Sequence, residues 1–323
     1  MTNNLNLKGL GSVFKTTLNN ELQDNLVEFF EWSLLEKGNY FNVTLGELSE
    51  NNSDYSRLKL SNNENYTTGQ AWEGFRSNWV WQSGISFTPP PIVAFNNALP
   101  GISGVYLNDS FLPTSTTGQY QYKIDYYNGR VVFDNPIPTG SKVQAEYSYK
   151  YINLFYSNSL PWLSEVQYRS LDIPENFLQP KTGFDLPPES KLQLPAIAIE
   201  VVPKRTMKGY QLGGGQIVST DVLFHCIAED EYTRNKLVDI ISYQNDRDLT
   251  MFDSNELAAS GAFPLDHVGT PVSGALRYPE LIQNFPGGTM TLKNTVVQGM
   301  KSINTNFYAG IVRMTIDIIK LNI

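Results

Sequence analysis

The strongest constraint on the fold is an Asn-Gly pair, Asn128 and Gly129, which lies between two segments of alternating apolar and polar residues. These segments read "QYQYKIDY" before the pair and "RVVFD" after it. Both residues of such a pair tolerate positive φ angles, which the tight turn of a two-residue hairpin requires. The alternation has the period of a strand. The sequence therefore predicts an antiparallel β-hairpin at this position.

The hairpin belongs to a longer β-rich region over residues 104–156. "GVYLNDSFLP" predicts a second hairpin around Asn108 and Asp109, and "KVQAEYSYKYINLFY" predicts a further long strand. One face of that strand is apolar and consists of Val143, Ala145, Tyr147 and Tyr149. We expect a half-buried antiparallel meander that forms a small sandwich or barrel.

Residues Thr16 to Lys37 have the period of an amphipathic helix. Thr16 or Thr17 can cap its first turn, and Gly38 can end it. Its apolar stripe is Leu18, Leu22, Leu26, Phe29 and Phe30.

Two segments are predicted to be irregular. Residues 48–70 are polar and rich in turn formers, and residues 161–195 contain six prolines. A loop as long as the second is unusual inside a compact domain, so we expect a linker or an arm that lies on a neighbour. Between them lie three tryptophans, which more often fill a core or an interface than a ligand site: Trp72, Trp79 and Trp81.

A second regular region begins at residue 196. Residues 196–202 predict a strand, and residues 210–228 predict a strand pair with a glycine turn at Gly213, Gly214 and Gly215. A helix is predicted from Glu229 to Ser242, with carboxylates at its start. Its expected stripe is Thr233, Leu237, Ile240 and Ile241.

The rest of this region is predicted to be turn-rich over residues 254–300 and to end in a strand at residues 311–320. The order of elements predicts an α+β fold, in which a small sheet with helices on one face carries an inserted, Tyr-rich antiparallel β meander or sandwich. The expected domains are an N-terminal helix that packs on the C-terminal domain, an inserted β domain, a Pro-rich arm and the C-terminal α+β domain, at residues 1–50, 70–160, 161–195 and 196–323.

Composition excludes several classes of protein. The formal net charge is −8, with 24 Lys and Arg against 32 Asp and Glu, so the basic excess of a nucleic-acid-binding protein is lacking. The longest basic cluster is Lys204, Arg205 and Lys208. Cys226 is the single cysteine, which rules out an intrachain disulfide. We expect no signal peptide and no membrane helix, because no apolar stretch approaches about 20 residues.

No pattern of residues predicts catalysis or a cofactor. His225 adjoins Cys226, but neighbouring residues of a strand point to opposite faces, so the two do not form a dyad. The glycines of residues 213–215 lack the Lys-Ser/Thr pair of a phosphate-binding loop. The remaining acidic and histidine residues lack the spacing of a calcium or zinc site, and they are Asp246, Asp248, Asp253, Asp266 and His267.

Three carboxylates in aromatic surroundings leave a glycan-active site open: Glu73, Asp125 and Glu146. Nothing in their spacing singles them out. We therefore assign no catalytic, cofactor-binding or metal-binding residue.

The aromatic hairpins do carry a resemblance. "GVYLND", "DYYNGRVVFDNPI" and "VQAEYSYKY" within residues 104–156 resemble a segment that recurs in virion structural proteins of tailed bacteriophages. The order of elements outside this segment is similar to that of tail-terminator and neck proteins, which have a helix, a sheet with a long protruding hairpin, and a second helix before the last strand.

The resemblance implies a ring-forming homo-oligomer of six or twelve copies at the head–tail junction of a virion assembled in the bacterial cytoplasm. Its neighbours would be portal or connector proteins on one side and tail tube or sheath proteins on the other, and double-stranded DNA would pass through an acidic lumen. Aromatic and turn residues suit such contacts. The candidate interface residues are Trp79, Trp81, Tyr126, Asn128, Gly129, Tyr147, Tyr149, Gly213, Gly214 and Gly215.

Two alternatives remain open from the sequence. The first is a baseplate or fibre-attachment protein of the phage tail, whose Tyr-rich β domain touches host glycans. The second is a glycan-binding or glycan-active β protein.

Overall fold

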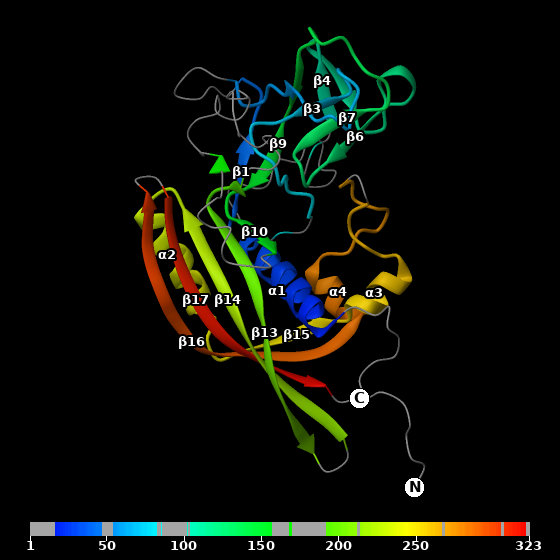
Figure 1. The fold of residues 1–323 in the computed structure, drawn as a ribbon. Helices are drawn as coiled ribbons and strands as arrows, with labels where there is room; N and C mark the ends of the chain where they lie inside the picture. The colour runs from blue at the N-terminus through cyan, green and yellow to red at the C-terminus, as the bar shows by residue number, and fades with distance from the viewer. Residues whose placement is uncertain are drawn as a thin grey trace.

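The computed structural model describes residues 17–46, 54–82, 85, 102, 104–156, 168–169, 192–211, 214–266, 269–304 and 307–320. The chain has a mixed α+β fold dominated by sheet. Figure 1 shows two parts: a curled six-stranded sheet packed on helices, and a smaller group of short strands, called here the β lobe.

The six-stranded sheet contains the longest strands of the molecule. In spatial order, its strands are β10 (Asn153–Tyr156), β13 (Ala196–Gln211), β14 (Gly214–Ala228), β17 (Phe307–Lys320), β16 (Pro286–Asn304) and β15 (Arg247–Phe252). Only β10 and β13 are parallel, and every other neighbouring pair is antiparallel. The predicted pair on either side of the glycine turn is confirmed as β13 and β14, but the strand predicted separately at residues 196–202 is part of β13, which runs without a break to Gln211.

Four α-helices occur among the described residues, and they are α1 (Leu18–Leu35), α2 (Glu231–Ser242), α3 (Ser254–Ser260) and α4 (Tyr278–Asn284). The predicted N-terminal helix is confirmed: the Thr17 hydroxyl accepts a hydrogen bond from the Asn20 N–H, and Gly38 follows the last turn at φ 83°. In α2 the predicted stripe is only partly right, because Arg234 and Val238 are buried in place of Thr233 and Ile240.

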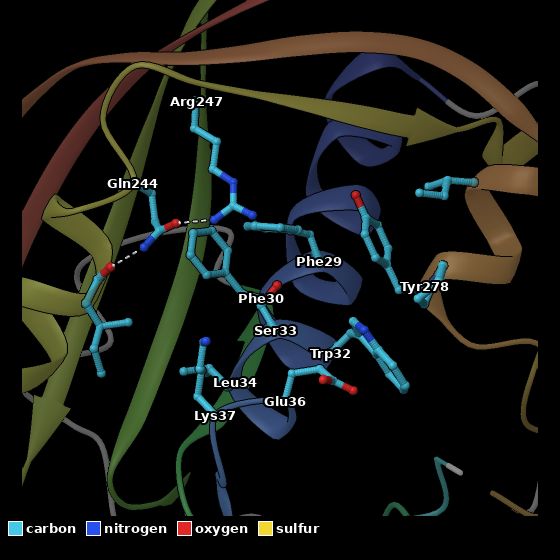
Figure 2. A pocket seen from close by; sticks show the side chains of 13 residues that line it. Phe29, Phe30, Trp32, Ser33, Leu34, Glu36, Lys37, Gln244, Arg247 and Tyr278 are labelled. Atoms are coloured by element: carbon cyan, nitrogen blue, oxygen red, sulfur yellow. Dashed lines mark hydrogen bonds between the residues drawn. The ribbon is translucent and has the colours of Figure 1, made fainter. Parts of the chain in front are cut away.

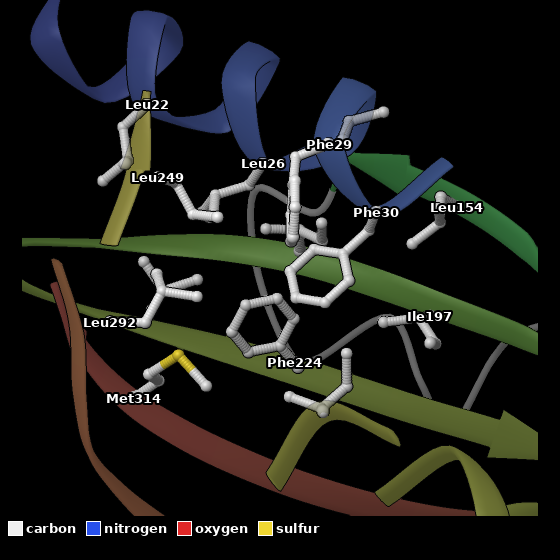
Figure 3. Close-up of a cluster of buried hydrophobic side chains, with 14 of the residues drawn as sticks. Leu22, Leu26, Phe29, Phe30, Leu154, Ile197, Phe224, Leu249, Leu292 and Met314 are labelled. Carbon is white, nitrogen blue, oxygen red and sulfur yellow. The ribbon is translucent and has the colours of Figure 1, made fainter. Parts of the chain in front are cut away.

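One hydrophobic cluster joins α1, α2 and a single face of the sheet. Figure 3 shows Leu22, Leu26 and Phe30 of α1 directed at the strands, where the ring of Phe30 meets that of Phe224 edge-on at 5.4 Å. Burying side chains of this size contributes about 1.5–3 kcal/mol each. The helices therefore hold one face of the sheet out of water.

The opposite face of the sheet is polar along β14, β17 and β16. Asp221 accepts a hydrogen bond from Arg313 at 2.5 Å and another from Thr315 at 2.9 Å. Asp317 pairs with Lys293 and accepts a hydrogen bond from Ser219. Cross-strand pairs of this kind suit a sheet face that is in contact with water.

The β lobe contains three small antiparallel sheets, ordered β2-β3-β7-β6, β5-β4-β8 and β1-β9. Its strands are β1 (Tyr40–Val43), β2 (Lys59–Leu60), β3 (Ala71–Glu73), β4 (Gly104–Leu107), β5 (Ser110–Pro113), β6 (Tyr122–Asp125), β7 (Arg130–Phe133), β8 (Val143–Ala145) and β9 (Tyr147–Lys150). A 3₁₀ turn, η2 (Gly118–Tyr120), precedes β6. A separate parallel pair joins β11 (Tyr168–Arg169) to β12 (Leu192–Gln193).

Both hairpins predicted in the β lobe are confirmed, as β4–β5 and β6–β7. The prediction of a simple, half-buried meander is wrong. Strand β7 pairs with β3 and not with β8, while β8 pairs with β4 and β9 pairs with β1. All residues from Val143 to Lys150 are buried, because strand β1 and residues 54–58 cover this segment.

The prediction that residues 254–300 are turn-rich is also wrong. This stretch contains α3, α4 and most of the 19-residue strand β16. Strand β16 lacks clean alternation because its register with β17 shifts at three places. Such bulges change which face successive residues occupy, so a period-2 pattern is lost.

The predicted domain boundaries cut through paired strands. Strand β1 belongs to the N-terminal segment but completes a sheet of the β lobe, and β10 leaves the β lobe to join the six-stranded sheet. The side chain of Asn39 bonds both the N–H and the carbonyl of Ile152 at this crossing. Most of the predicted Pro-rich arm lies outside the described residues.

Substitution of Trp79 tests whether the buried aromatic residues stabilise the β lobe. Its ring is 1% exposed, stacks on Tyr147 at 4.3 Å, and donates a hydrogen bond to the Arg76 carbonyl. We predict that Trp79→Ala lowers the free energy of unfolding by about 3–5 kcal/mol, because a large cavity replaces the ring. Urea denaturation followed by circular dichroism measures this.

Tyr127→Ala is the matched control, since Tyr127 is an aromatic residue of the same lobe but is 64% exposed. It should change the free energy of unfolding by no more than about 0.5 kcal/mol. Equal effects of the two substitutions would contradict the proposed role of Trp79.

Candidate interaction site

Several residues predicted to form an interface lie inside the molecule. Trp79, Tyr147 and Tyr149 are 1%, 0% and 7% exposed and belong to the core of the β lobe. Their prediction as contact residues is wrong, because the β lobe is small and uses these rings to fill its own interior. Most of their surface is therefore covered by the lobe itself.

The predicted Asn-Gly turn also serves the fold. The Asn128 N–H and side-chain amide both donate to the Asp125 carboxylate, at 3.0 and 2.7 Å. Gly129 has φ 65°, and a Cβ there would lie 2.5 Å from the Arg76 carbonyl oxygen. Tyr126 is half-buried against the core of the lobe. Thus the turn contacts its own subunit closely on its inner side.

The carboxylates considered for a glycan-active site have structural partners. Arg130 is buried between Asp125 and Glu73, at 3.4 and 3.9 Å from their oxygens. Glu146 accepts a hydrogen bond from the Leu45 N–H at 3.0 Å. Burial raises the pKa of Asp125, and the Asn128 hydrogen bonds and Arg130 oppose that shift. These groups therefore hold together segments of the β lobe.

His225 and Cys226 point to opposite faces of β14, as predicted. The His225 Nε2 lies 2.8 Å from Glu200, while Cys226 lies in the helix-covered core. Burial raises the pKa of the Cys226 thiol far above its usual range and lowers that of His225. Neither change activates a nucleophile.

No group of three or more His, Cys, Asp or Glu residues with metal-binding geometry occurs among the described residues. Asp253 caps α3, and Asp248 accepts a hydrogen bond from Thr291. Asp266 accepts one from the Thr270 N–H. His267 lies outside the described residues.

A pocket of about 430 Å³ lies between α1, α2, α4 and the start of β15. Figure 2 shows its apolar walls, including Phe29, Trp32 and Tyr278. Arg247 stacks over Phe29 at 4.9 Å and donates to Gln244 at 2.7 Å. The apolar walls of this pocket suit an apolar side chain.

A second cavity, of about 470 Å³, lies where α1 meets the β lobe, and we call it the acidic cleft. Glu28 and Glu31 of α1 line it together with Lys150 of β9. Its other walls are largely aromatic or apolar and include Trp79, Trp81, Tyr127, Phe155, Tyr156 and Phe263. Of the predicted interface residues, Trp81 is half-buried in this wall.

Acidic groups outnumber basic ones in the acidic cleft. Lys150 Nζ lies 2.5 Å from Glu31, which also accepts a hydrogen bond from Gln82. Asp24, one turn before Glu28, accepts a hydrogen bond from Tyr156 at 3.1 Å. Burial, followed by repulsion from Glu31, raises the pKa of Glu28 to about 8, although Lys150 opposes the shift. Lys150 therefore does not neutralise the group of carboxylates.

The spacing of these carboxylates was visible in the sequence. Asp24, Glu28 and Glu31 recur at i, i+4 and i+7, which places them on one face of a helix. The apolar stripe of α1 identified the buried face, but a polar face is ordinarily solvated. What makes this one a cleft is the β lobe above it, which contributes Tyr127 and Lys150.

The glycines predicted to form an interface belong to a projecting hairpin. Gly214 begins β14 and Gly215 has φ 89°, while Gly213 lies outside the described residues. Figure 1 shows the tip of β13 and β14 at the end of the molecule opposite the β lobe. We call residues 203–211 of β13 the basic arm, because Lys204, Arg205 and Lys208 lie in it.

Residues 203–210 of the basic arm are exposed, with Met207 at 54% and Tyr210 at 38%. The arm pairs with β14 on one side only, because β10 covers β13 no further than Ile199. Its other backbone edge has no strand partner among the described residues.

Comparisons with known proteins give no relative for this chain. No protein-family model, no curated protein and no solved structure matches it. Within the described part of the chain, the helices are too short or too polar to cross a membrane.

Arg130 provides a test of the structural role of the carboxylates. We predict that Arg130→Met lowers the free energy of unfolding by about 3–5 kcal/mol, since it leaves Glu73 and Asp125 buried without their cation. Without Arg130 the pKa of Asp125 should rise further, so the loss should be larger at pH 7.5 than at pH 5. Urea denaturation at both pH values measures this, and Arg130→Met combined with Glu73→Gln should recover part of the loss.

Glu28 should make stability depend on pH. Its pKa is about 8 in the folded protein against an ordinary value of 4.5 for an exposed Glu, so the native state holds a proton that the unfolded state releases. Native stability therefore falls as pH rises from about 4.5 to 8. We predict that Glu28→Gln removes this fall and is more stable than the original chain at pH 8 by roughly 1–3 kcal/mol.

Thermal unfolding from pH 5 to pH 8 measures the effect of Glu28→Gln. Glu256→Gln, at an exposed position of α3, is the matched control and should leave the pH profile unchanged. Parallel profiles for the original chain and Glu28→Gln would show that Glu28 titrates normally.

Proposed function

We propose that this chain is a ring-forming structural subunit of a tailed-phage virion, similar to neck and tail-terminator proteins, that joins head to tail and lets DNA pass. The resemblance of residues 104–156 to phage virion proteins supports the virion class. The observation that carries the proposal is the projecting hairpin, whose basic arm leaves one strand edge without a partner in the described chain.

An exposed strand edge is a ready template for pairing with another chain, and monomeric proteins usually shorten or cover such edges. Here the edge runs for about nine residues, which span roughly 30 Å in an extended strand. Lys204, Arg205 and Lys208 discourage indiscriminate pairing while leaving a partner of opposite charge acceptable. This combination favours a specific contact over aggregation.

The opposite side of the sheet carries a second and different surface. Strand β15 covers β16 only as far as Leu292, so the outer edge of residues 293–304 has no strand partner among the described residues. Val296, Val297 and Met300 are 53%, 45% and 45% exposed there. This edge is a second contact area, separate from the basic arm, and a subunit with unlike surfaces can make head-to-tail contacts that close into a ring when the rotation permits.

The net charge of −8 supports the second part of the proposal. DNA that moves through a ring must not adhere to its wall, and an acidic wall repels phosphates. The polar ladder on the uncovered face of the sheet carries Asp221 and Asp317, each paired with a cation, Arg313 or Lys293, so this face is polar and close to charge-balanced. In the proposed ring this face lines the opening.

Mass photometry of the purified chain tests the ring. Since one copy has a mass of 36.4 kDa, we predict a single dominant assembly of several copies, with a central opening in negative-stain electron micrographs. In virions, antibody labelling should mark the head–tail junction. A chain that stays monomeric at micromolar concentration, or labels only the distal tail tip, would contradict the proposal.

Paired substitutions locate the contact. Val296→Asp with Val297→Asp should shift the assembly to smaller species by placing charge in the second surface. Tyr232→Asp with Tyr243→Asp is the matched control, because these residues are 79% and 82% exposed at the two ends of α2. The control should assemble like the original chain.

A further inference from the structure

We propose that the basic arm of one copy docks in the acidic cleft of the next copy. This proposal depends on one part of the proposed function, namely that copies of this chain associate. It adds the two surfaces that meet and the charge that selects them.

The acidic cleft has the size and lining for basic side chains. Its volume is about 470 Å³, with Glu28 and Glu31 on one wall and Trp81, Tyr127 and Tyr156 around them. Aromatic faces and carboxylates together bind ammonium and guanidinium groups, since the ring faces attract cations and the carboxylates accept their hydrogen bonds. The methylene stems of Lys and Arg can pack on the apolar part of the walls.

One carboxyl group of the cleft, that of Glu28, has no hydrogen-bond donor or ion-pair partner among the described residues of its own chain. Glu31 is occupied by Lys150 and Gln82, and Asp24 by Tyr156. Glu28 makes no hydrogen bond or ion pair within the part of the chain that the structure describes, although Lys150 acts on it electrostatically. Burial, followed by repulsion from Glu31, raises the pKa of Glu28 to about 8, and a further cation beside it would favour its charged form.

The basic arm has the complementary composition. Its three cations lie within five residues, and residues 203–211 contain no Asp or Glu. The side chains of Lys204, Arg205 and Lys208 make no ion pair with the described residues. Lys208 and Tyr210 occupy one face of the strand, while Arg205 and Met207 occupy the other. Each of these faces therefore places a cation beside an apolar side chain.

The two surfaces belong to opposite ends of one molecule. Figure 1 shows the arm at the end of the sheet away from the β lobe, whereas the cleft lies where α1 meets that lobe. An arm that leaves its own body in this way meets the cleft of another copy. The contact is head-to-tail, so every copy uses both surfaces and the chain of contacts closes into a ring.

Charge favours docking of the basic arm in the acidic cleft over its pairing with the free edge of β16. The free edge of β16 carries Lys301 and Lys293, of which Lys293 is paired with Asp317, and residues 293–304 contain no Asp or Glu. Pairing the basic arm with that edge would bring like charges together, which is unfavourable. Duplex DNA is the other acidic partner, and the test below separates it from the cleft.

Charge exchange between two variants tests the docking. Lys204→Glu with Lys208→Glu makes the arm acidic, and Glu28→Lys makes the cleft basic. Each variant alone should raise the dissociation constant for assembly about tenfold or more in mass photometry. An equimolar mixture should assemble again with alternating copies, because each acidic arm then meets a basic cleft and each basic arm an acidic one.

The matched control is Lys123→Glu with Lys236→Glu, which changes the net charge equally at two exposed positions of β6 and α2. It should assemble like the original chain. Circular dichroism establishes that every variant is folded. Assembly by both single-surface variants as tight as that of the original chain overturns the docking but leaves the ring intact, whereas an original chain that never assembles overturns both.

Cross-linking of the unmodified chain gives a second measurement that needs no variant. A carbodiimide joins a carboxylate directly to a nearby amine, so mixed isotope-labelled and unlabelled copies should yield links from Lys204 or Lys208 to Asp24, Glu28 or Glu31 between copies. Links from the arm to other carboxylates only would overturn the proposal. So would an arm variant that assembles normally but loses binding to duplex DNA.

Discussion

Helix α1 lies on one face of the six-stranded sheet and is hydrogen-bonded to strands near both of its edges. The curled shape of the sheet depends on these two attachments. The Gln23 side chain donates to the Ile199 carbonyl in β13, while Asn25 bonds both the N–H and the carbonyl of Phe252 in β15. These strands are second and last in the sheet. A flat sheet could not bring both to one helix, so the sheet must curl. Leu22, Leu26 and Phe30 then fill the enclosed space.

The sequence predicts the parts of this arrangement that depend on local patterns, such as helix α1, and misses those that depend on long-range strand pairing. The apolar stripe of α1 and the Asn128-Gly129 turn are local signals, because period and turn chemistry depend on neighbours in the chain. Burial of both faces of Val143–Lys150 depends on β1, about a hundred residues earlier. Strand β16 lost its period to bulges against β17. No local pattern carries such long-range pairings.

The candidate site shows the same division. Single features of the two proposed surfaces can be recognised in the sequence. Glu28 and Glu31 of the acidic cleft are spaced along one helix face together with Asp24, and Lys204, Arg205 and Lys208 form the longest basic cluster. Their role in binding could not be predicted, because it depends on the fold. The β lobe lies over the carboxylates, and the cations lie in a hairpin at the opposite end of the molecule. The aromatic residues were assigned to interfaces because composition does not reveal which rings the lobe needs for its own core.

The aromatic residues of the β lobe stabilise its fold, because its short strands need the apolar burial that the rings supply. The β lobe consists of strands of two to four residues, each too short to be stable by its backbone pairing, so stacked rings such as Trp79 on Tyr147 supply the apolar burial. Rings used in this way cannot also be offered to a neighbour. In the assembly that we propose, contacts between copies therefore draw on charge and free strand edges, whose strength depends on fit and salt. Copies held by such contacts can dissociate and pair again until the register is correct, which the proposed ring requires.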